Sequence, residues 1–288
     1  SPKDVLDNFD KTTKILESPF TSIRIIAMKK LYSLARKKGS VVILEGDGGD
    51  EIFGGYARYV IAYLEQCINA AIEGTYNNGN YVVTIESIIP NLGLLREYKP
   101  MMQKFWSKGM FESMDRRYFH LSDRSADMFD EVIWKDLDRE KVFEDFRRIF
   151  NNENNVGHEA YFDKMTHFDF KCLLPALLHV EDRMSMAHGL ESRVPLLDHS
   201  LVEFAATVPA NIKFKDGNMK HMMKTVFKDH LPDSLINRRD KMGFPVPLRE
   251  WFNKELAGFL KDTFSGMQKK NRPLFNAKSI LDNFAHEA

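Results

Sequence analysis

The sequence predicts an α/β fold with a long, mostly helical second part, and three observations support this prediction. Residues 22–38 space their apolar side chains as an amphipathic helix does. A short, continuous apolar run follows at residues 41–44, and such runs are typical of buried parallel strands. Beyond residue 50, most segments return to helical spacing. A helix, a short turn and a strand make half of a β-α-β unit, so we expect the strand to belong to a sheet.

Composition and charge bound the classes of function. The chain has 288 residues, enough for one large domain or two smaller ones with a substantial core. Lys+Arg and Asp+Glu both number 41, so nothing attracts the chain as a whole to nucleic acid or to an anionic membrane. We find no apolar run of the ~18 residues that a membrane-spanning helix needs. Two cysteines, Cys67 and Cys172, fit a reducing cytoplasm better than a disulfide framework.

The first helix and strand have clear sequence signals. Basic residues fill the last turn of the helix at 22–38, and Gly39 follows it, as the helix dipole and a left-handed C-cap favour. The strand is the run Val-Val-Ile-Leu at 41–44. Helical spacing resumes from Ile52 to Leu64.

The remaining segments are predicted as helices joined by polar connectors. We expect loops at 75–81 and 151–159, short helices with turns at Pro90 and Pro100, and a charged amphipathic helix at 129–150. A further helix is predicted at 159–188, with a break or kink at Pro175, and residues 192–199 are predicted to be an irregular connector. Further helices are expected at 199–207, 218–230, 247–265 and 278–286.

One strand cannot make a sheet. Either more strands lie at 79–86 and 211–215, or the rest of the sheet belongs to residues before Ser1. We favour the second alternative, because the long remainder of the chain is helical in pattern.

The stretch LEGDGGDEIFGGY at 44–56 combines five glycines with four acidic residues, directly after the strand. In open α/β sheets, ligands bind beyond the carboxyl ends of the strands. Glycines let the backbone approach a ligand or take a positive φ, and amides at a helix N-terminus bind phosphate. Carboxylates repel bare phosphate but hold Mg²⁺, which phosphates can share. This glycine–acid loop therefore predicts a magnesium–nucleotide site.

Two simpler interpretations of the same loop compete with a nucleotide site. Asp50 and Glu51 could merely cap a helix, but a cap does not require Gly46, Gly54 or Gly55. A calcium loop is another alternative, although the spacing does not match the twelve-residue pattern.

Three stretches resemble motifs of the asparagine synthetase family. The glycine–acid loop is similar to the family signature Leu-Ser-Gly-Glu-Gly-Ser/Ala-Asp-Glu-Leu-Phe-Gly-Gly-Tyr. Residues 173–205 contain VEDRMSMA and ESRVPLLD, which resemble Val-Asp-Arg-Met-Ser-Met-Ala and Glu-Ala-Arg-Val-Pro-Phe-Leu-Asp. Residues 220–252 are similar to the family's lysine-containing run before Gly-Phe-x-x-Pro. The three motifs occur in the family's order and span most of the chain.

The resemblance implies an adenine-nucleotide alpha-hydrolase-like (PP-loop ATPase) synthetase domain. Residues 1–75 would be the remaining part of its nucleotide-binding α/β core, and residues 76–288 its mainly helical part. The family binds ATP and Mg²⁺ and activates a carboxylate, here expected to be aspartate for asparagine biosynthesis, as an acyl-adenylate. Ammonia, usually released from glutamine by an upstream glutaminase domain, then attacks.

The resemblance also assigns roles to residues. Asp50 matches the ligand of the Mg²⁺ that bridges the phosphates, and Gly46 matches a backbone contact to the nucleotide. Asp47 matches a Glu used around the acyl-adenylate. Lys241 matches a lysine that neutralises charge on the α-phosphate and pyrophosphate, a role that lowers a barrier by several kcal/mol in a dry site. The predicted cofactor-binding set is completed by Glu45, Gly48 and Glu51.

Outside the loop, structural interpretations compete with functional ones. On spacing alone, Lys241 is a surface lysine in the basic patch 238–241, and only the family motif favours catalysis. Asp182 and Arg183 could form ion pairs with Glu191 and Arg193 at a helix end. Asp182 is also a candidate substrate-side acid.

The sequence departs from the family in three ways. The Ser-Gly-Gly-x-Asp-Ser pyrophosphate loop is not found and is expected upstream of Ser1, and the N-terminal cysteine of the glutaminase domain is not found either. We therefore expect a fragment that is inactive alone. Glu45 stands where the family has Ser, and Asp47 where it has Glu, which changes charge and reach near the reaction.

These departures leave the substrate open. The acid could be aspartate, a sugar-linked carboxylate of a surface polysaccharide, or a carboxylate cyclised onto an internal amine, as in β-lactam synthetases. A non-catalytic scaffold of the same fold is the alternative from another class. The nitrogen donor, glutamine or free ammonia, and the oligomeric state, with a homodimer among the alternatives, also stay open.

Overall fold

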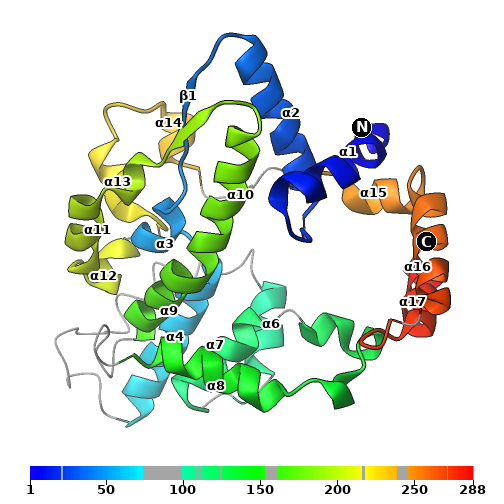
Figure 1. Ribbon diagram of the computed structural model, residues 1–288. Coiled ribbons are helices and arrows are strands. Elements are labelled where there is room, and N and C mark those ends of the chain that lie inside the picture. Colours follow the sequence, from blue (N-terminus) through cyan, green and yellow to red (C-terminus); the bar gives the residue numbers. More distant parts are fainter. Residues whose placement is uncertain are drawn as a thin grey trace.

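Two short parallel strands and the helices packed against them form one end of the molecule (Figure 1). Strand β1, Val42–Leu44, pairs with β2, Glu191–Arg193, and Ile43 lies opposite Ser192. The structure is a computed structural model that describes the chain except for residues 21, 74–98, 108, 110–111, 124, 153–160, 216–217, 239–245, 271 and 288. Within the described residues, the sheet consists of these two strands.

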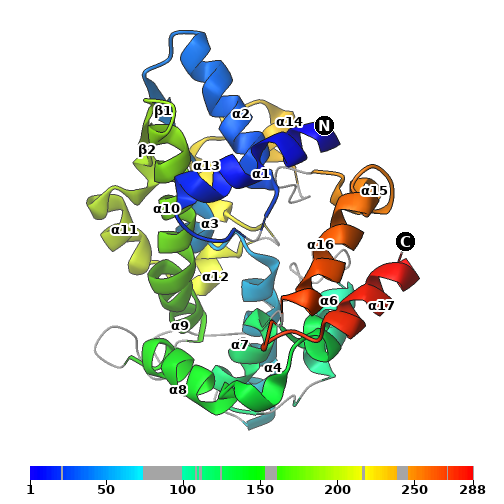
Figure 2. The same ribbon diagram turned by 45° about the vertical axis from the view of Figure 1, so that its right-hand side comes forward.

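Three helices cover one face of this small sheet. Helix α1, Pro2–Leu16, begins with a capping box between Ser1 and Asp4, and α2, Arg24–Lys37, is followed by Gly39 at φ +91°. Helix α10, Leu174–Met186, lies beside both (Figure 2). Their buried side chains, together with Leu190, form a cluster on which Ile43 packs: Leu16, Ile25, Tyr32 and Met184.

The opposite face of β1 is apolar and exposed. Val42 is 41% exposed and Leu44 is 72% exposed. The prediction of a parallel strand is therefore confirmed, whereas the prediction that this strand is buried is wrong. The reason is that alternate residues of a strand face opposite ways, and α1, α2 and α10 cover only the face that holds Ile43.

The second strand falls in a segment predicted to be an irregular connector. Residues 192–199 contribute to β2 and to the 3-10 turn η5, Pro195–Leu197. The alternative strand at 211–215 is wrong, because helix α12, Ala210–Lys213, occupies it, and the alternative at 79–86 lies outside the described residues. The residues of β2, Glu-Ser-Arg, have no apolar alternation from which a strand could be predicted.

A larger, aromatic core lies at the other end of the molecule, between helices α4, α7, α8 and α9 (Figure 1). Helix α4 spans Ala57–Glu73, α7 spans Met114–Ser122, and α9 spans Tyr161–Phe168. Helix α8, Arg139–Phe150, begins ten residues later than predicted, because the Asp138 carboxylate caps it by accepting from the Lys141 amide at 2.9 Å. Two 3-10 segments precede it: η2, Ser125–Glu131, and η3, Trp134–Asp136.

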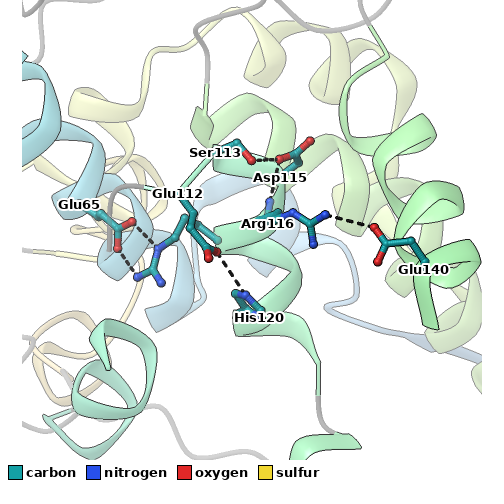
Figure 3. Close-up of polar contacts among 8 residues, drawn as sticks. Glu65, Glu112, Ser113, Asp115, Arg116, His120 and Glu140 are labelled. Atoms are coloured by element: carbon teal, nitrogen blue, oxygen red, sulfur yellow. Dashed lines mark hydrogen bonds and ion pairs between the residues drawn. The ribbon is translucent and has the colours of Figure 1, made fainter. Parts of the chain in front are cut away.

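Ion pairs on both sides hold α7 in this core (Figure 3). Arg117 and Glu65 are each 1% exposed, and the guanidinium donates to both carboxylate oxygens, at 2.6 and 2.7 Å. On the other side, Arg116 reaches the exposed Glu140 of α8 at 3.1 Å. Phe105 of α6, Lys99–Trp106, lies under the Arg117 guanidinium, 3.9 Å from ring centroid to Cζ. Pro100 is in the first turn of α6, so the turn predicted there is wrong.

The helix predicted at 159–188 is confirmed with a change of winding near Pro175. Helix α9 runs into a π-helical turn, η4, Asp169–Leu173, and α10 follows with Pro175 in its first turn. Pro175 has no amide hydrogen to donate, and the π-helical turn ends just before it.

The remaining helices complete two other sides of the molecule. Two helices, α15 (Leu248–Asn253) and α16 (Ala257–Lys269), divide the segment predicted as one helix at 247–265. After α16, the Leu274 carbonyl accepts a backbone hydrogen bond from the Ile133 amide. None of the helices in the described part of the chain is both long and apolar enough to cross a membrane. Cys67 is buried, Cys172 is exposed, and both are free. The helices not yet given are α11 His199–Ala206, α13 His221–Val226, α14 Asp233–Ile236 and α17 Ala277–Glu287.

Candidate functional site

The glycine–acid loop leaves the carboxyl end of β1 and contains one short helix between two glycine turns. Helix α3, Gly49–Phe53, has Gly48 before it at φ +85° and Gly54 after it at φ +71°. Both glycines are in the left-handed region, which side chains with a Cβ rarely adopt. The prediction that a helix opens near Asp50 is therefore confirmed, but the helix is only five residues long.

Most of the glycines here face protein atoms. A Cβ on Gly48 would lie 2.2 Å from the Leu197 side chain, and one on Gly55 would lie 1.8 Å from the carboxylate of Asp50. Gly46 differs, because a Cβ there would meet nothing within 4 Å. The structure thus gives the glycines after Gly46 a packing role, and leaves open space at Gly46, where the backbone could approach a ligand.

Asp50 forms an ion pair with Lys220, a residue that the sequence analysis did not single out. The ammonium lies 2.7 Å from the Asp50 carboxylate, and the two side chains are 35% and 27% exposed. Lys220 comes just before α13 and has a left-handed backbone, with φ 55°. Its stem lies over Gly55, where a Cβ would be 2.4 Å from Lys220 Cε. The signal that could have found Lys220 is its place at the start of the third family motif.

Glu45 and Asp47 are half-buried acids of the same loop, as Asp50 is. The Tyr32 hydroxyl donates to Glu45 at 3.2 Å. Burial, and then the charge of Asp47, raise the pKa of Glu45 above its usual range. Burial, and then the charge of Asp50, raise the pKa of Asp47 in the same way. These mutually repelling carboxylates favour a cation beside them.

Glu51 points into the protein rather than out of the loop. The residue is 2% exposed, and its carboxylate accepts a hydrogen bond from the Tyr56 hydroxyl at 2.6 Å. Burial and this hydrogen bond raise the pKa of Tyr56. Glu51 is therefore placed behind Asp50, without direct access to solvent.

The ion pairs predicted to join Asp182 and Arg183 to Glu191 and Arg193 are not formed in the described part of the chain, so this prediction is wrong. Arg193 pairs with Glu191 of its own strand at 2.9 Å, whereas Arg183 pairs at 2.9 Å with Glu17, the residue that follows α1. Asp182 is exposed, and no hydrogen bond or ion pair found among the described residues joins its carboxylate to the glycine–acid loop. Lys241 lies outside the described residues, in the segment 239–245.

A neighbouring acid, Glu181, was missed by the sequence analysis. It is 6% exposed and faces β2, where the Ser192 hydroxyl approaches its carboxylate at 3.5 Å. Burial raises the pKa of Glu181 to about 7. Nothing in the sequence distinguishes the buried carboxylate of Glu181 from the exposed carboxylate of Asp182.

The donor set fits a cation that is shared with a phosphate-bearing ligand. Among the described residues, no three His, Cys, Asp or Glu side chains converge as a complete metal site. Mg²⁺ in nucleotide sites uses one or two carboxylates and completes its shell with phosphate oxygens and water. Asp50, with Glu45 and Asp47 in the same loop and open space at Gly46, matches this requirement.

Comparison with known proteins agrees with the three motifs. The model of the family described as asparagine synthase matches residues 1–288. Asparagine synthetase [glutamine-hydrolyzing] 1 of Bacillus subtilis (strain 168) is 27% identical over 280 residues, which are 93% of this chain and 40% of that protein.

Two further relatives extend the comparison. Amidase chry2 of Gibberella zeae is 22% identical over 264 residues, which are 86% of this chain and 38% of that protein. Asparagine synthetase [glutamine-hydrolyzing] of Rattus norvegicus is 40% identical over 86 residues, which are 28% of this chain and 15% of that protein. The chain spans about two fifths of the length of the Bacillus and Gibberella relatives.

Proposed function

The chain belongs to the asparagine synthase family, and we propose that it is the synthetase part of an ATP-dependent, amide-forming ligase. The observation that supports this most directly is the loop after β1. There, Asp50 faces Lys220 at 2.7 Å, two further half-buried acids lie close by, and the backbone is open at Gly46. A magnesium-bound triphosphate needs this combination of carboxylate, cation and accessible backbone.

The proposed reaction has two steps. An oxygen of the substrate carboxylate attacks the α-phosphorus of ATP, an O–P bond forms, and pyrophosphate leaves with the electrons of the broken bond. Ammonia then attacks the activated acyl carbon, loses a proton and expels AMP. Mg²⁺, when bound, offsets the charge of the phosphates during the first step.

In this proposal the chain's own residues have distinct roles. Asp50 holds Mg²⁺, with Glu45, Gly46 and Gly48 along the nucleotide, and Glu51 supports Asp50 from behind. Lys220 exchanges its contact with Asp50 for a contact with phosphate when nucleotide binds, and Lys241 adds a second cation to the departing pyrophosphate. Asp47 faces the acyl-adenylate, and Asp182 stays a proposed substrate-side acid.

We further propose the PP-loop ATPase-like α/β fold for the nucleotide-binding core. The exposed apolar face of β1 supports this fold, because covering Val42 and Leu44 with further strands or helices would remove apolar surface from water and stabilise the protein. The core would include residues 1–75 and also β2, which belongs by sequence to the mainly helical part, residues 76–288. The pyrophosphate loop would come from another part of the longer protein.

Aspartate is the proposed acid, and glutamine the proposed source of ammonia through a glutaminase domain elsewhere in the protein. The names of the Bacillus and Rattus relatives, both glutamine-hydrolyzing asparagine synthetases, support this choice. A second acceptor acid is the alternative, because Glu45 and Asp47 alter the charge and reach of the loop. The two free cysteines support a cytoplasmic location. A homodimer stays an open alternative.

ATP–pyrophosphate exchange by the full-length protein tests the proposal. With Mg²⁺ and a panel of carboxylic acids, we expect exchange that depends on aspartate. Asp50→Asn should lower the exchange rate at least about 100-fold if the carboxylate holds the metal. Asp145→Asn is the matched control, because Asp145 is an exposed acid paired with Arg148 on the remote helix α8. Exchange with another acid alone would change the substrate, and no exchange with any acid would contradict the proposed ligase.

A further inference from the structure

The helix that holds Asp50 has little of its own to fix its direction. Helix α3 has five residues, and the glycines on both sides of it have positive φ angles. Glycine has no Cβ and can adopt many backbone conformations, so turns built from it need support from contacts elsewhere. On its inner side, Ile52 and Phe53 pack in a cluster with Ala205. These apolar contacts keep one side of the helix packed against the protein, but they do not involve the Asp50 carboxylate and so do not set its direction.

A polar strap crosses the glycine turn after α3. The Tyr56 hydroxyl donates to the buried Glu51 carboxylate at 2.6 Å, and so ties the start of α4 back to the residue next to Asp50. Between the two ends of this strap lie Gly54 and Gly55, and the Gly55 amide donates to the Asp50 carbonyl at 2.8 Å. The strap therefore restricts rotation of the backbone at Gly54 and Gly55, and with it the orientation of α3 relative to α4.

Two neighbouring side chains, Arg58 and Tyr59, hold the ring of Tyr56 in place. The Arg58 guanidinium lies over it, 4.0 Å from the ring centroid, and the Tyr59 ring meets it edge-on at 5.4 Å. Arg58 is held by the Tyr118 hydroxyl, which accepts from Nε at 3.0 Å, and by an ion pair with Asp169.

Asp169 is the anchor of this arrangement. It is 4% exposed, and its carboxylate accepts from Arg58, Tyr59 and Tyr118. It is also the first residue of the π-helical turn between α9 and α10, and such turns are frequent near functional sites. A continuous set of contacts thus runs from the π-helical turn through Arg58 and Tyr56 to Glu51.

The geometry points to Tyr56, Arg58 and Asp169 as positioning residues that hold α3 so that the Asp50 carboxylate faces Lys220 and the nucleotide. This inference rests on the proposed function, since it assigns Asp50 the metal. Glu51 transmits the effect from inside the protein, which explains why an acid in this loop is buried.

Tyr56→Phe is the decisive variant, because it removes one hydroxyl and leaves the ring between Arg58 and Tyr59. Tyr161→Phe is its control, because it makes the same change at a buried tyrosine whose hydroxyl has no hydrogen-bond partner within the described residues. In the full-length protein, hydrogen exchange should become about ten-fold faster in the peptide 46–56 of Tyr56→Phe, as expected when a hydrogen bond to a carboxylate is lost. The same peptide should be unchanged in Tyr161→Phe.

The second measurement is the Mg²⁺ dependence of ATP–pyrophosphate exchange. The Mg²⁺ concentration for half-maximal exchange should rise about ten-fold in Tyr56→Phe, in line with a hydrogen bond to a charged group, and should stay unchanged in Tyr161→Phe. A merely structural role would lower the folded fraction and the maximal rate, without changing the half-saturating Mg²⁺. That result would overturn the positioning role.

Two variants test the anchor, and the outcomes separate the two proposals. Tyr118→Phe removes one donor to Asp169 and should show the same changes at about half the size on a logarithmic scale, since Arg58 and Tyr59 remain as donors. Asp169→Asn should change the hydrogen exchange and the half-saturating Mg²⁺ concentration more than Tyr118→Phe does. If Asp169→Asn does not fold, the result for Tyr118→Phe decides the role of the anchor. Unchanged hydrogen exchange at 46–56 in Tyr56→Phe would overturn the strap. No pyrophosphate exchange by the wild-type protein would instead overturn the proposed function, and the hydrogen-exchange result would still decide the strap.

Discussion

The two ends of the molecule differ in how far they bury their apolar side chains. The helical end buries a closed core of aromatic side chains, in which Tyr118 and Phe150 are fully buried. The sheet end buries only one face of β1 and leaves Leu44 72% exposed at the start of the glycine–acid loop. Within the described residues, the helical end therefore buries its apolar side chains, whereas the sheet end exposes one apolar face of β1.

This difference teaches where stability and function lie. The aromatic core holds the charged pair Arg117 and Glu65 away from water, because each side chain is 1% exposed. The candidate site, in contrast, lies next to a small sheet, at the end of a strand of three residues that pairs with one other strand of three residues. The contacts that run from Asp169 through Arg58 to Tyr56 link the two ends, because Tyr56 is bonded to Glu51 of the glycine–acid loop.

The largest expected effect is in the closed core. Glu65→Gln leaves the buried Arg117 guanidinium without its counter-charge, and should reduce the free energy of unfolding by about 3–5 kcal/mol. Urea unfolding monitored by circular dichroism measures this change. Glu140→Gln is the matched control, because Glu140 pairs with the adjacent Arg116 on the exposed side of the same helix and should cost less than about 1 kcal/mol. Equal costs for the two variants would show that the core is not closed around the pair.

The next effect tests whether the sheet end is completed in the full-length protein. If further chain covers β1, as proposed, Leu44→Ala should cost about 2–5 kcal/mol there, since it would delete a buried side chain. Val142→Ala is the control, because Val142 is 59% exposed on the outside of α8 and should cost less than about 0.5 kcal/mol. A negligible cost for Leu44→Ala would mean that β1 stays an exposed edge, and would remove the main support for a larger sheet.

The same contrast explains which features could be predicted from the sequence. Strand β1 and helix α2 have their own apolar patterns, so both were predictable. Strand β2 has the residues Glu-Ser-Arg and forms only because β1 lies beside it, so no local signal exists. The start of α8 was missed because the cap Asp138 looks like any acidic residue of a charged helix.

The candidate site shows the same limit. Asp50 and the glycine–acid loop were predictable, because their residue types and spacing are unusual. Lys220 is 170 residues away in sequence, and its contact with Asp50 depends on the fold. The partner of Arg183 was predicted among its sequence neighbours, but Glu17 was nearer in space.

The smallest expected effect concerns Glu181, which lies beneath the sheet and responds to pH. Its pKa is about 7 in the folded protein, above the value of 4.5 for an unperturbed Glu, because burial disfavours the charged form. Below pH 4.5 both folded and unfolded chains hold the proton, so the group costs nothing. Between pH 4.5 and 7 the unfolded chain releases the proton first, so stability falls as pH rises through this window.

Glu181→Gln removes this ionisation and keeps a side chain of similar size that can still contact Ser192. We expect the variant to be more stable than wild type at pH 8, by on the order of 1 kcal/mol, and the gain to vanish at pH 4. Urea unfolding at the two pH values measures the difference. Asp182→Asn, which removes an exposed acid next to Glu181, is measured in parallel as the control. A gain that persists at pH 4 would assign the effect to packing rather than to the proton. Equal stability of Glu181→Gln and wild type at both pH values would mean that water reaches this carboxylate, and that even the covered face of the sheet is open.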